Sequence, residues 1–450
     1  MIVKIYVLGI CGTFMGGLAQ LAMQKGIEVA GCDENIYPPM SNILAEQSIK
    51  VDQGFNTDNI TDDIDLYVIG NVVSRGNPLM EEILNKKLSF VSGPHFLTEI
   101  ILENRHVIAI SGTHGKTSTS SMITKVLIDA GLDVGYMIAG RALDLDSTAS
   151  LGTHKYFVIE ADEYDTAFFD KRSKFIHYNP STLLINNLEF DHADIFDDLP
   201  AIKKQFHHLL RIMPNQSKII YPEDDKEVLE VIKMGIFCDQ IKFDSEKKSG
   251  GWHAEINNPE CASFKIFNGK KLMGEINWDL IGEHNKKNAL ATFVIASSLG
   301  IKEEQISDSL SSFKGTARRM ELIGKQNLVT VYDDFAHHPT AIKYTLDALR
   351  KKVGEEKIIC LLEMRSNTMA SGYHDQLIPE SLEDADKVFL FSKNSQQVEA
   401  IAKRDKRFSV CSGTREFIKL LPEINKPNTH IICLSNGSFD QIHHAILERL

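Results

Sequence analysis

A short glycine-rich loop that ends in lysine and threonine is the strongest chemical signal in the sequence. It reads SGTHGKT over residues 111–117 and joins a predicted strand, His106–Ser111, to a predicted helix, Thr117–Ala130. Backbone N–H groups in such a loop converge on phosphate oxygens, and the start of the helix adds positive potential. Lys116 is then placed to reach the β- and γ-phosphates of a nucleotide, and the Thr117 hydroxyl is placed to hold Mg²⁺.

The loop matches the shorter form of the phosphate-binding pattern, GTxGKT. The longer form requires a glycine where this chain has Ile110. The plain alternative is a strand-to-helix turn that carries a surface lysine, but strand, loop and helix follow in the order that a nucleotide site requires. The residues assigned to the nucleotide by this loop are Gly112, Thr113, Gly115, Lys116, Thr117 and Ser118.

Two acidic segments follow other predicted strands. Glu160 ends the strand Tyr156–Glu160, and a carboxylate at the end of a strand beside a phosphate loop suits Mg²⁺. The segment NLEFDH follows the strand Thr182–Asn186, and its His192 is a candidate ligand for a second Mg²⁺. Taken singly, these residues fit an acidic turn and a structural histidine. Their shared position at the expected sheet edge of the phosphate loop favours metal sites.

Two asparagines and a pair of arginines could contact other parts of a nucleotide. Asn285 and Asn288 stand three residues apart on the predicted helix Asn285–Leu299, so they share one face. Their amides offer the paired donor and acceptor that the edge of adenine requires, although Asn285 also fits a helix cap. Arg318 and Arg319 stand at a predicted domain boundary, from which an arginine can reach a phosphate across a cleft. The alternative for this pair is a solvated basic surface.

Three glycines follow the first predicted strand, Ile2–Leu8. Gly9, Gly12 and Gly16 have the spacing GxxGxxxG, and a diphosphate can rest on the amides of such a turn. The spacing departs from the GxGxxG of dinucleotide-binding oxidoreductases, which disfavours that class of enzyme. No Ser/His/Asp triad and no zinc-ligand spacing stands out in the sequence.

The elements that must position these residues alternate between strand-like and helix-like runs, which predicts an α/β fold. We predict three domains, over residues 1–105, 106–314 and 315–450. Each domain has a polar or glycine-rich loop after a strand, where ligands bind in open α/β sheets. In the third domain this loop is Asp333–His338, which follows the predicted strand Val329–Tyr332. Residues 217–277 give no clear pattern.

The composition limits the classes of partner. The chain has 49 lysines and arginines against 61 aspartates and glutamates, a net charge of −12, so we expect no nucleic-acid binding. Its seven cysteines form no CxxC pair, which fits reduced thiols in the cytoplasm. The apolar N-terminal run lacks the basic start of a signal peptide, and no stretch is long enough to span a bilayer. We therefore expect a cytoplasmic protein that does not associate with membranes.

Together these residues resemble the Mur ligases of bacterial peptidoglycan assembly. The segments GTHGKTST, EADEYD, NNLEFDH, GEHNKKNA, RRME and DDFAHHP stand in the family's order, and the resemblance covers essentially the whole chain. It implies a Rossmann-like N-terminal domain that binds a UDP-sugar and a central P-loop ATPase domain. It also implies a Rossmann-like C-terminal domain that binds the amine or peptide substrate.

The resemblance implies ATP and Mg²⁺ as cofactors and assigns residues to both. It places Glu160 on the first metal ion and His192 on the second, with adenine against the two asparagines. Arg319 would face the phosphates, and Asp334 and His338 would lie on the ribose and phosphate side. The residues implied as catalytic are Lys116, His114, His192 and Arg319, with the two histidines as candidates for the proton of an amine. The residues implied for the UDP-sugar are Gly9, Gly12, Thr13, Phe14, Met15, Gly16, Asp33, Asn71, Arg75 and Asn77.

Within the family, the chain is most similar to the branch that acts in peptidoglycan recycling. That branch joins UDP-N-acetylmuramate to the murein tripeptide L-alanyl-γ-D-glutamyl-meso-diaminopimelate through an acyl phosphate. In this chain, two predicted strands of the last domain end in the polar loops 363–368 and 435–438. Arg365 can pair there with a peptide carboxylate, and Ser366, Asn367 and Asn436 can bond amides. No obligate protein partner is expected.

Two alternatives remain. The sister ligase that adds L-alanine to UDP-N-acetylmuramate shares the GTHGKT and DDxxHHP segments. A non-catalytic UDP-sugar sensor is disfavoured by the intact Lys116, Thr117, Glu160 and His192. Several sister ligases carry a carbamoylated lysine after the DH motif. The corresponding stretch here, Lys203–His208, gives no clear counterpart, and we do not predict that modification.

Overall fold

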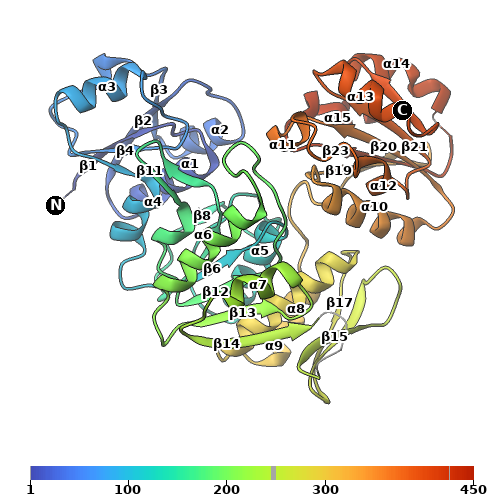
Figure 1. The fold of residues 1–450 in the computed structure, drawn as a ribbon, viewed down its shortest axis with the longest axis horizontal. Helices are drawn as coiled ribbons and strands as arrows, with labels where there is room; N and C mark the ends of the chain where they lie inside the picture. Colours follow the sequence, from blue (N-terminus) through green and yellow to red (C-terminus); the bar gives the residue numbers. More distant parts are fainter. Residues whose placement is uncertain (1, 245–249, 425) are drawn as a thin grey trace. The chain divides into compact units, whose positions relative to one another are not determined.

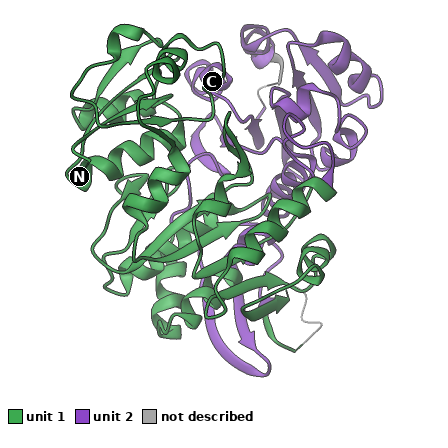
Figure 2. Cartoon of the chain, turned by 60° about the vertical axis from the view of Figure 1, so that its left-hand side comes forward, with its two compact units in different colours: residues 1–189, 200–253, 289–313 green, residues 190–199, 254–288, 314–450 purple. Residues whose placement is uncertain are grey.

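The computed structural model of the protein describes residues 2–244, 250–424 and 426–450, and these form two compact units (Figure 2). The first unit comprises residues 1–189, 200–253 and 289–313. The second comprises residues 190–199, 254–288 and 314–450. The first unit holds two parallel sheets and the second holds one large sheet, so the expected α/β class with parallel sheets is confirmed.

The first sheet contains five parallel strands in the order β3-β2-β1-β4-β5 (Figure 1). Its strands are β1 (Lys4–Leu8), β2 (Glu28–Asp33), β3 (Lys50–Gln53), β4 (Leu66–Ile69) and β5 (Phe90–Ser92). The helical segments are α1 (Thr13–Gln24), α2 (Met40–Glu46), η1 (Thr57–Asn59), α3 (Pro78–Asn85), α4 (Gly93–Phe96) and η2 (Leu97–Ile101). The central strand β1 is a nearly unbroken apolar run, as expected for a strand that is covered on both faces.

The second sheet of the first unit has the strand order β15-β14-β13-β12-β6-β9-β7-β8. Its central strands are β6 (His106–Ser111), β9 (Tyr156–Ala161), β12 (Thr182–Ile185) and β13 (Lys218–Pro222). Its outer strands are β7 (Gly135–Met137), β8 (Ala149–Ser150), β14 (Asp239–Asp244) and β15 (Trp252–Ile256). The helices are α5 (Lys116–Asp129), α6 (Leu199–Ile212), α7 (Lys226–Lys233) and α9 (Glu303–Ser311). A separate hairpin of β10 (Asp165–Ala167) and β11 (Asp170–Ser173) leads into η3 (Lys174–His177).

The large sheet of the second unit has the order β18-β19-β23-β20-β21-β22. Its strands are β18 (Glu321–Gln326), β19 (Val329–Asp334), β20 (Lys357–Glu363), β21 (Lys387–Phe391), β22 (Phe408–Cys411) and β23 (Thr429–Leu434). The helical segments are α10 (Pro339–Val353), α11 (Asn367–Ala370), α12 (Ile378–Ser381), α13 (Ser395–Ala402), α14 (Thr414–Ile424), η4 (Phe439–Gln441) and α15 (Ile442–Arg449). A hairpin of β16 (Ser263–Asn268) and β17 (Lys271–Asn277) also belongs to this unit, and α8 (Glu283–Ser298) runs from it into the first unit.

Strand β20 shows how the core of the second unit is divided between the two faces of its sheet. Ile358 and Leu362 pack with helices α10, α12 and α13, whereas Ile359 and Leu361 pack with α14 and α15. Successive side chains of a strand point to opposite faces, so a continuous apolar strand supplies both cores. The central strands of this sheet are therefore fixed, and the loops at their carboxyl ends start from rigid positions.

The structure changes two of the expected elements at the candidate site. Strand β19 continues through Asp334, so the expected polar loop from Asp333 to His338 is wrong in its first two residues. Helix α8 begins at Glu283 rather than Asn285, which places Asn285 inside the first turn instead of at the cap. The unclear stretch 217–277 contains strands β13 to β17 and helix α7, and its residues 245–249 lie outside the described residues.

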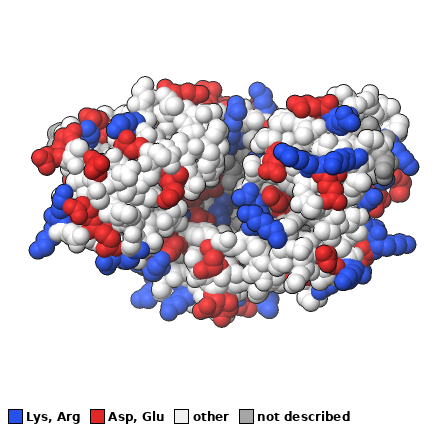
Figure 3. Space-filling view, turned by 90° about the horizontal axis from the view of Figure 1, so that it is seen from above, with Lys and Arg blue, Asp and Glu red and all other residues white. Residues whose placement is uncertain are grey.

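The surface and the cysteines agree with the composition. On the face seen in Figure 3, acidic and basic side chains are interspersed rather than gathered into one basic stripe. All seven cysteines are free thiols. Among the described residues, every helix is too short or too polar to cross a lipid bilayer.

One pair of glycines tests the packing of the second sheet. Gly152 has φ +54, and a Cβ there would overlap the backbone of Val134 beside β7. Gly300 has φ +86, but a Cβ there would meet nothing within 4 Å. We expect Gly300→Ala to cost only the left-handed backbone penalty, about 1 kcal/mol, and Gly152→Ala to cost more because a backbone must also move. Urea unfolding of the two variants measures this difference, and equal midpoints would contradict it.

Candidate active site

The phosphate-binding loop forms between β6 and α5, as the sequence predicts. Its two glycines have positive φ values, +127 at Gly112 and +81 at Gly115, and Gly115 caps the helix. A Cβ on Gly112 would lie 2.9 Å from the carbonyl oxygen of Asn187, so the loop passes close to the end of β12. This close approach and the unusual backbone require glycine at both positions.

Lys116 is held at the loop by both backbone and carboxylate groups. Its Nζ donates to the Gly112 carbonyl at 2.8 Å and lies 3.2 Å from Glu163 and 3.4 Å from Asp162. Burial opposes the charged form of the side chain, but the carboxylates of Glu163, Asp162 and Glu160 outweigh it and raise the pKa of Lys116. Lys116 therefore carries a full positive charge at the loop, ready to face phosphate oxygens.

Thr117 and Glu160 meet on neighbouring elements, α5 and β9. The Thr117 hydroxyl donates to one Glu160 oxygen at 3.2 Å, and the other Glu160 oxygen accepts from the Ala139 N–H at 2.8 Å. Loss of hydration raises the pKa of the Glu160 carboxyl, although the Ala139 N–H and Lys116 act in the opposite direction. Two oxygens this close, from a hydroxyl and a carboxylate, suit one Mg²⁺ that also binds phosphate oxygens and water.

The segment after β12 fastens the phosphate-binding loop. The Asn187 side chain accepts from the His114 N–H at 2.8 Å and donates to the His114 carbonyl at 3.0 Å. The Thr113 hydroxyl accepts from the Glu189 N–H at 2.8 Å, and the Glu189 carboxylate lies 3.5 Å from the His114 ring. Sequence reasoning assigned no role to Asn187. Its position directly after a buried strand, opposite the glycine loop, was the available signal.

The glycine turn after β1 is organised by Asp33. The Gly9 N–H donates to the Cys32 carbonyl at 2.8 Å, and Gly9 has φ +80. Asp33 accepts from the Cys11 N–H at 2.9 Å and from the Asn35 N–H at 3.0 Å, with 8% of its surface exposed. The resemblance predicts Asp33 as a substrate contact; the structure gives its carboxylate two backbone partners that shape the turn.

Other residues predicted for the UDP-sugar lie around the same sheet edge. Phe14 and Met15 start α1 beside Gly93, whose Cβ would meet both side chains. Asn77 caps α3 by accepting from the Met80 N–H at 3.1 Å, and Arg75 forms a two-point ion pair with Glu81. Arg75 and Asn77 thus have local partners of their own, and their contacts with a ligand remain predictions. Gly12, Thr13, Gly16 and Asn71 lie in or beside the loops at the ends of β1 and β4.

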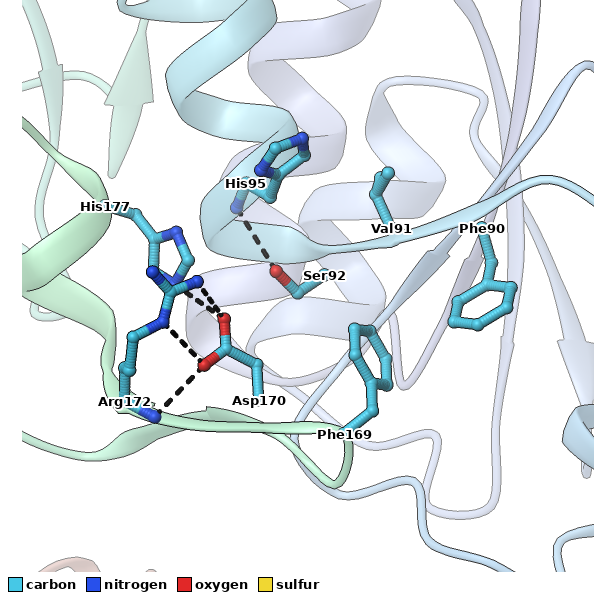
Figure 4. Close-up of a pocket in the computed structure, with 8 residues that line it drawn as sticks. All are labelled: Phe90, Val91, Ser92, His95, Phe169, Asp170, Arg172 and His177. Carbon is cyan, nitrogen blue, oxygen red and sulfur yellow. Dashed lines mark hydrogen bonds and ion pairs between the residues drawn. The ribbon is translucent and has the colours of Figure 1, made fainter.

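A pocket of about 420 Å³ lies beside the hairpin β10–β11 (Figure 4). Asp170 holds this hairpin together, because it pairs with Arg172 at 2.6 Å and with His177 at 3.2 Å. The bond from Arg172 lowers the pKa of the Asp170 carboxyl, and burial lowers the pKa of His177. The Thr98 hydroxyl donates to the His177 carbonyl at 2.7 Å, which joins the hairpin segment to the first sheet. The pocket is lined by Phe90, Val91, Ser92, His95, Phe169, Asp170, Arg172 and His177.

In the second unit, Asp334 bonds the turn Arg318–Met320, which we call the arginine turn. It accepts from the Met320 N–H at 2.6 Å and from the Ala336 N–H at 2.7 Å, and burial raises the pKa of its carboxyl. Arg319 lies over the ring of Phe335 at 5.2 Å. Two backbone N–H groups already donate to the Asp334 carboxylate, so the predicted contact of Asp334 with ribose would come in addition to a structural role. Arg319 and Asp334 both belong to the second unit, and their contacts with a nucleotide remain predictions.

Arg318 has a different role from its neighbour. It donates to Asp333 at 2.8 Å and to the Ser435 carbonyl at 2.7 Å, and its φ is +59. A non-glycine residue holds such a backbone only where its surroundings fix it. Arg318 therefore joins the ends of β19 and β23, and leaves Arg319 as the arginine available to a ligand.

The DH turn also belongs to the second unit. His192 has φ +60, and its N–H donates to Asp191 at 2.8 Å. Thr368 donates to Asp191 at 3.1 Å and accepts from the Ala193 N–H at 3.3 Å. Burial opposes ionisation of Asp191, but the neighbouring histidines outweigh it and lower the pKa of this carboxyl. His338 caps α10 through Thr340 N–H at 3.3 Å, and its other ring nitrogen lies 3.3 Å from the Phe190 carbonyl.

The two polar loops expected to receive a peptide meet at the ends of β20 and β23. The Ser435 hydroxyl donates to Glu363 at 2.5 Å, and the guanidinium of Arg365 lies against Gly437, where a Cβ would overlap it. Ser366 caps the short helix that starts at Asn367, by accepting from the Met369 N–H at 3.3 Å. The two loops therefore lie side by side in the second unit, and their contacts with a peptide remain predictions. Asn436 stands between Ser435 and Gly437 in the same loop.

The asparagines predicted for adenine start helix α8. The Asn285 side chain donates to the Ile281 carbonyl at 2.8 Å, and Asn288 is 4% exposed. Lys286 pairs with Glu283 in the same turn. The Asn285 amide thus uses one donor on its own chain, and contact of either asparagine with adenine remains a prediction.

Lys203 of α6 lies in the stretch Lys203–His208, where sister ligases suggested a carbamoylated lysine, and it has partners of its own. Its ammonium pairs with Glu227 and, at 2.6 Å, with Glu230 on α7. Burial acts against the charge, but the two glutamates outweigh it and raise the pKa of Lys203. Lys203 thus joins α6 to α7 through two ion pairs.

Comparison with known proteins gives matches over nearly the whole chain. Residues 4–105 match the model "Mur ligase family, catalytic domain", and residues 110–296 match "Mur ligase middle domain". Residues 318–437 match "Mur ligase, glutamate ligase domain". These three ranges hold the glycine turn, the phosphate-binding loop and the arginine turn, respectively.

Individual relatives and a solved structure match end to end. An Escherichia coli protein named UDP-N-acetylmuramate–L-alanyl-gamma-D-glutamyl-meso-2,6-diaminoheptandioate ligase is 46% identical over 99% of this chain and 98% of its own. A Haemophilus influenzae protein of the same name is 43% identical over 99% of both chains. The crystal structure of a murein peptide ligase from Psychrobacter arcticus 273-4 is 37% identical, with a TM-score of 0.77, over 99% of this chain and 98% of that one. Relatives named UDP-N-acetylmuramate–L-alanine ligase are 28–31% identical.

Lys116 provides the direct test of the phosphate-binding loop. We expect Lys116→Ala to lower turnover, measured as ADP release, by ~10²–10³-fold, the usual effect of losing one charge stabiliser. We expect the variant to be less stable, because it removes the cation that pairs with Glu163 and Asp162, but still folded, because both sheets are intact. Circular dichroism checks the fold. A folded variant with near-normal ADP release would exclude Lys116 from the reaction.

Proposed function

The chain belongs to the Mur ligase family, and we propose that it joins UDP-N-acetylmuramate to L-alanyl-γ-D-glutamyl-meso-diaminopimelate with conversion of ATP to ADP. The observation that carries this function is the end-to-end identity of 46% and 43% to two ligases named for that reaction. Relatives named for the addition of L-alanine fall to 28–31%. The tripeptide reaction is therefore favoured over the alanine-adding one.

The reaction solves a leaving-group problem. A carboxylate oxygen of the muramoyl group attacks the γ-phosphorus of ATP, ADP leaves, and an acyl phosphate forms. The amine of the peptide then attacks the acyl carbon, and the tetrahedral intermediate expels phosphate as the amide bond forms. Because phosphate leaves far more readily than oxide, the enzyme has mainly to hold the reactants in line and to offset charge.

The phosphate-binding loop supplies that charge compensation. The Lys116 ammonium and the N–H groups at the start of α5 would face the β- and γ-phosphates. Phosphate oxygens of ATP would take the place of the carboxylates that pair with Lys116. Thr117 and Glu160 would hold one Mg²⁺, and His192 would contribute to a second. Bound there, Mg²⁺ would offset the negative charge of the phosphates.

The loops at the ends of β20 and β23 are suited to the peptide. A tripeptide of this kind carries several carboxylates, whereas alanine carries one. The Arg365 guanidinium lies against the backbone of Gly437. The same two loops also contain Ser366, Asn367 and Asn436. A cation beside amide-bonding side chains recognises a carboxylate on a peptide. The sensor alternative has no comparable support, because the residues for ATP turnover are all present.

Metal dependence tests the cofactor. We expect EDTA to abolish ADP release and added Mg²⁺ to restore it, because ATP approaches a loop lined by Glu160, Asp162 and Glu163. The paired variants Glu160→Gln and Glu99→Gln compare a candidate metal ligand with a glutamate of the first sheet region. Only Glu160→Gln should raise the Mg²⁺ concentration needed for half-maximal rate. Undiminished turnover in EDTA would remove Mg²⁺ from the proposal.

The choice of amine tests the function itself. At saturating ATP and UDP-N-acetylmuramate, we expect kcat/KM for the tripeptide to exceed that for L-alanine by up to about 10⁴, the range that unpaired buried partners can produce. Arg365→Met should reduce this preference more than Arg404→Met, an arginine of the same unit that bonds Asp375 and Gln376 in the loop before α12. A higher kcat/KM for L-alanine would identify the biosynthetic reaction instead.

A further inference from the structure

Lys174 joins two loops that the proposed reaction uses separately. It is the first residue of η3, and its Nζ lies 5.6 Å from the ring centre of Phe14 and 5.5 Å from that of Tyr164. Its backbone N–H donates to the Tyr164 carbonyl at 2.8 Å, which fixes the start of η3 to the acidic loop. All three residues belong to the first unit, so the arrangement is set within one compact body.

Each ring marks one of the two loops. Phe14 stands in the first turn of α1, directly after the glycine turn where a diphosphate is expected. Tyr164 follows Asp162 and Glu163, the carboxylates that face Lys116 at the phosphate-binding loop. A UDP-sugar that extends from the glycine turn toward Lys116 must cross the space between these loops. The Lys174 ammonium lies between the two loops, about equally far from the ring that follows each of them.

In the part of the chain that the structure describes, no carboxylate forms an ion pair with the Lys174 ammonium. Its neighbours on the hairpin are paired, Lys171 with Asp165 at 2.5 Å and Arg172 with Asp170 at 2.6 Å. Among the described residues, Lys174 forms no ion pair, although acidic side chains occur on both sides of it in the sequence. Aromatic rings hold a cation in place without neutralising it. A half-buried cation fixed in this way is positioned to receive an anion.

We propose that Lys174 binds the diphosphate of the UDP-sugar, with Phe14 and Tyr164 holding its ammonium over the glycine turn. This inference rests on the proposed function for the identity of the ligand. It adds a side-chain cation to a turn whose other expected contacts are backbone N–H groups. It also gives the β10–β11 hairpin a role, since the hairpin leads into η3, whose His177 carbonyl accepts from the Thr98 hydroxyl of η2.

The test measures binding of UDP to the full-length protein by calorimetry, without ATP or amine. We expect Lys174→Met to weaken UDP binding by about tenfold or more, the usual effect of losing a charge-assisted bond to phosphate. Lys174→Arg should recover most of the affinity, because it keeps the cation over both rings. Lys171→Met is the matched control, a lysine three residues earlier that is paired with Asp165, and it should leave UDP affinity within twofold.

The outcomes separate binding from structure and from the proposed function. A folded Lys174→Met protein that binds UDP as the wild type does would overturn the inference, and so would an equal loss in Lys171→Met. If UDP binding is unchanged but KM for UDP-N-acetylmuramate rises, the cation meets the muramoyl part instead, and the diphosphate assignment is wrong. A wild-type protein that binds UDP through Lys174 but ligates no amine would support the inference and refute the proposed function.

Discussion

The charge balance around Lys116 is the constraint on which the phosphate-binding region depends. A largely buried ammonium stands against Glu163 and Asp162, with Glu160 close behind on β9. A lone charge in this position would be costly, and so would the carboxylates without the cation. The cation and the carboxylates therefore offset one another's cost of burial. The fold must then keep β6 and β9 adjacent, which their parallel pairing from His106 to Ser111 does.

The same order of construction recurs at each candidate site. A buried strand ends, and the following backbone is fastened by a side chain from a neighbouring strand. Asn187 does this for the phosphate-binding loop, and Asp33 does it for the glycine turn. In the second unit, Arg318 joins the ends of β19 and β23 in the same way. Polar side chains at these strand ends thus shape the backbone first, and only some remain available to a ligand.

The sequence predicted the strands that end at these loops, because continuous apolar runs identify buried parallel strands. Strand β6 has the predicted bounds, and the loop after it needs glycine at residues whose φ is positive. The structural role of Asp33 and Asp334 was not predictable, since one backbone partner of each comes from a turn far away in the sequence. The β10–β11 hairpin was missed as well. Its charged residues resemble a solvated surface, and only the fold shows Asp170 gathering Arg172 and His177.

The ion pairs of Lys203 have a consequence for how the enzyme responds to its surroundings. Related ligases that carry a carbamate take its carbon from dissolved carbon dioxide, so their metal sites depend on that gas. Here the raised pKa leaves less neutral amine at Lys203 than an ordinary lysine has, and Glu227 and Glu230 compete for it. Helix α6 is therefore attached to α7 at this residue by two ion pairs that need no carbamate.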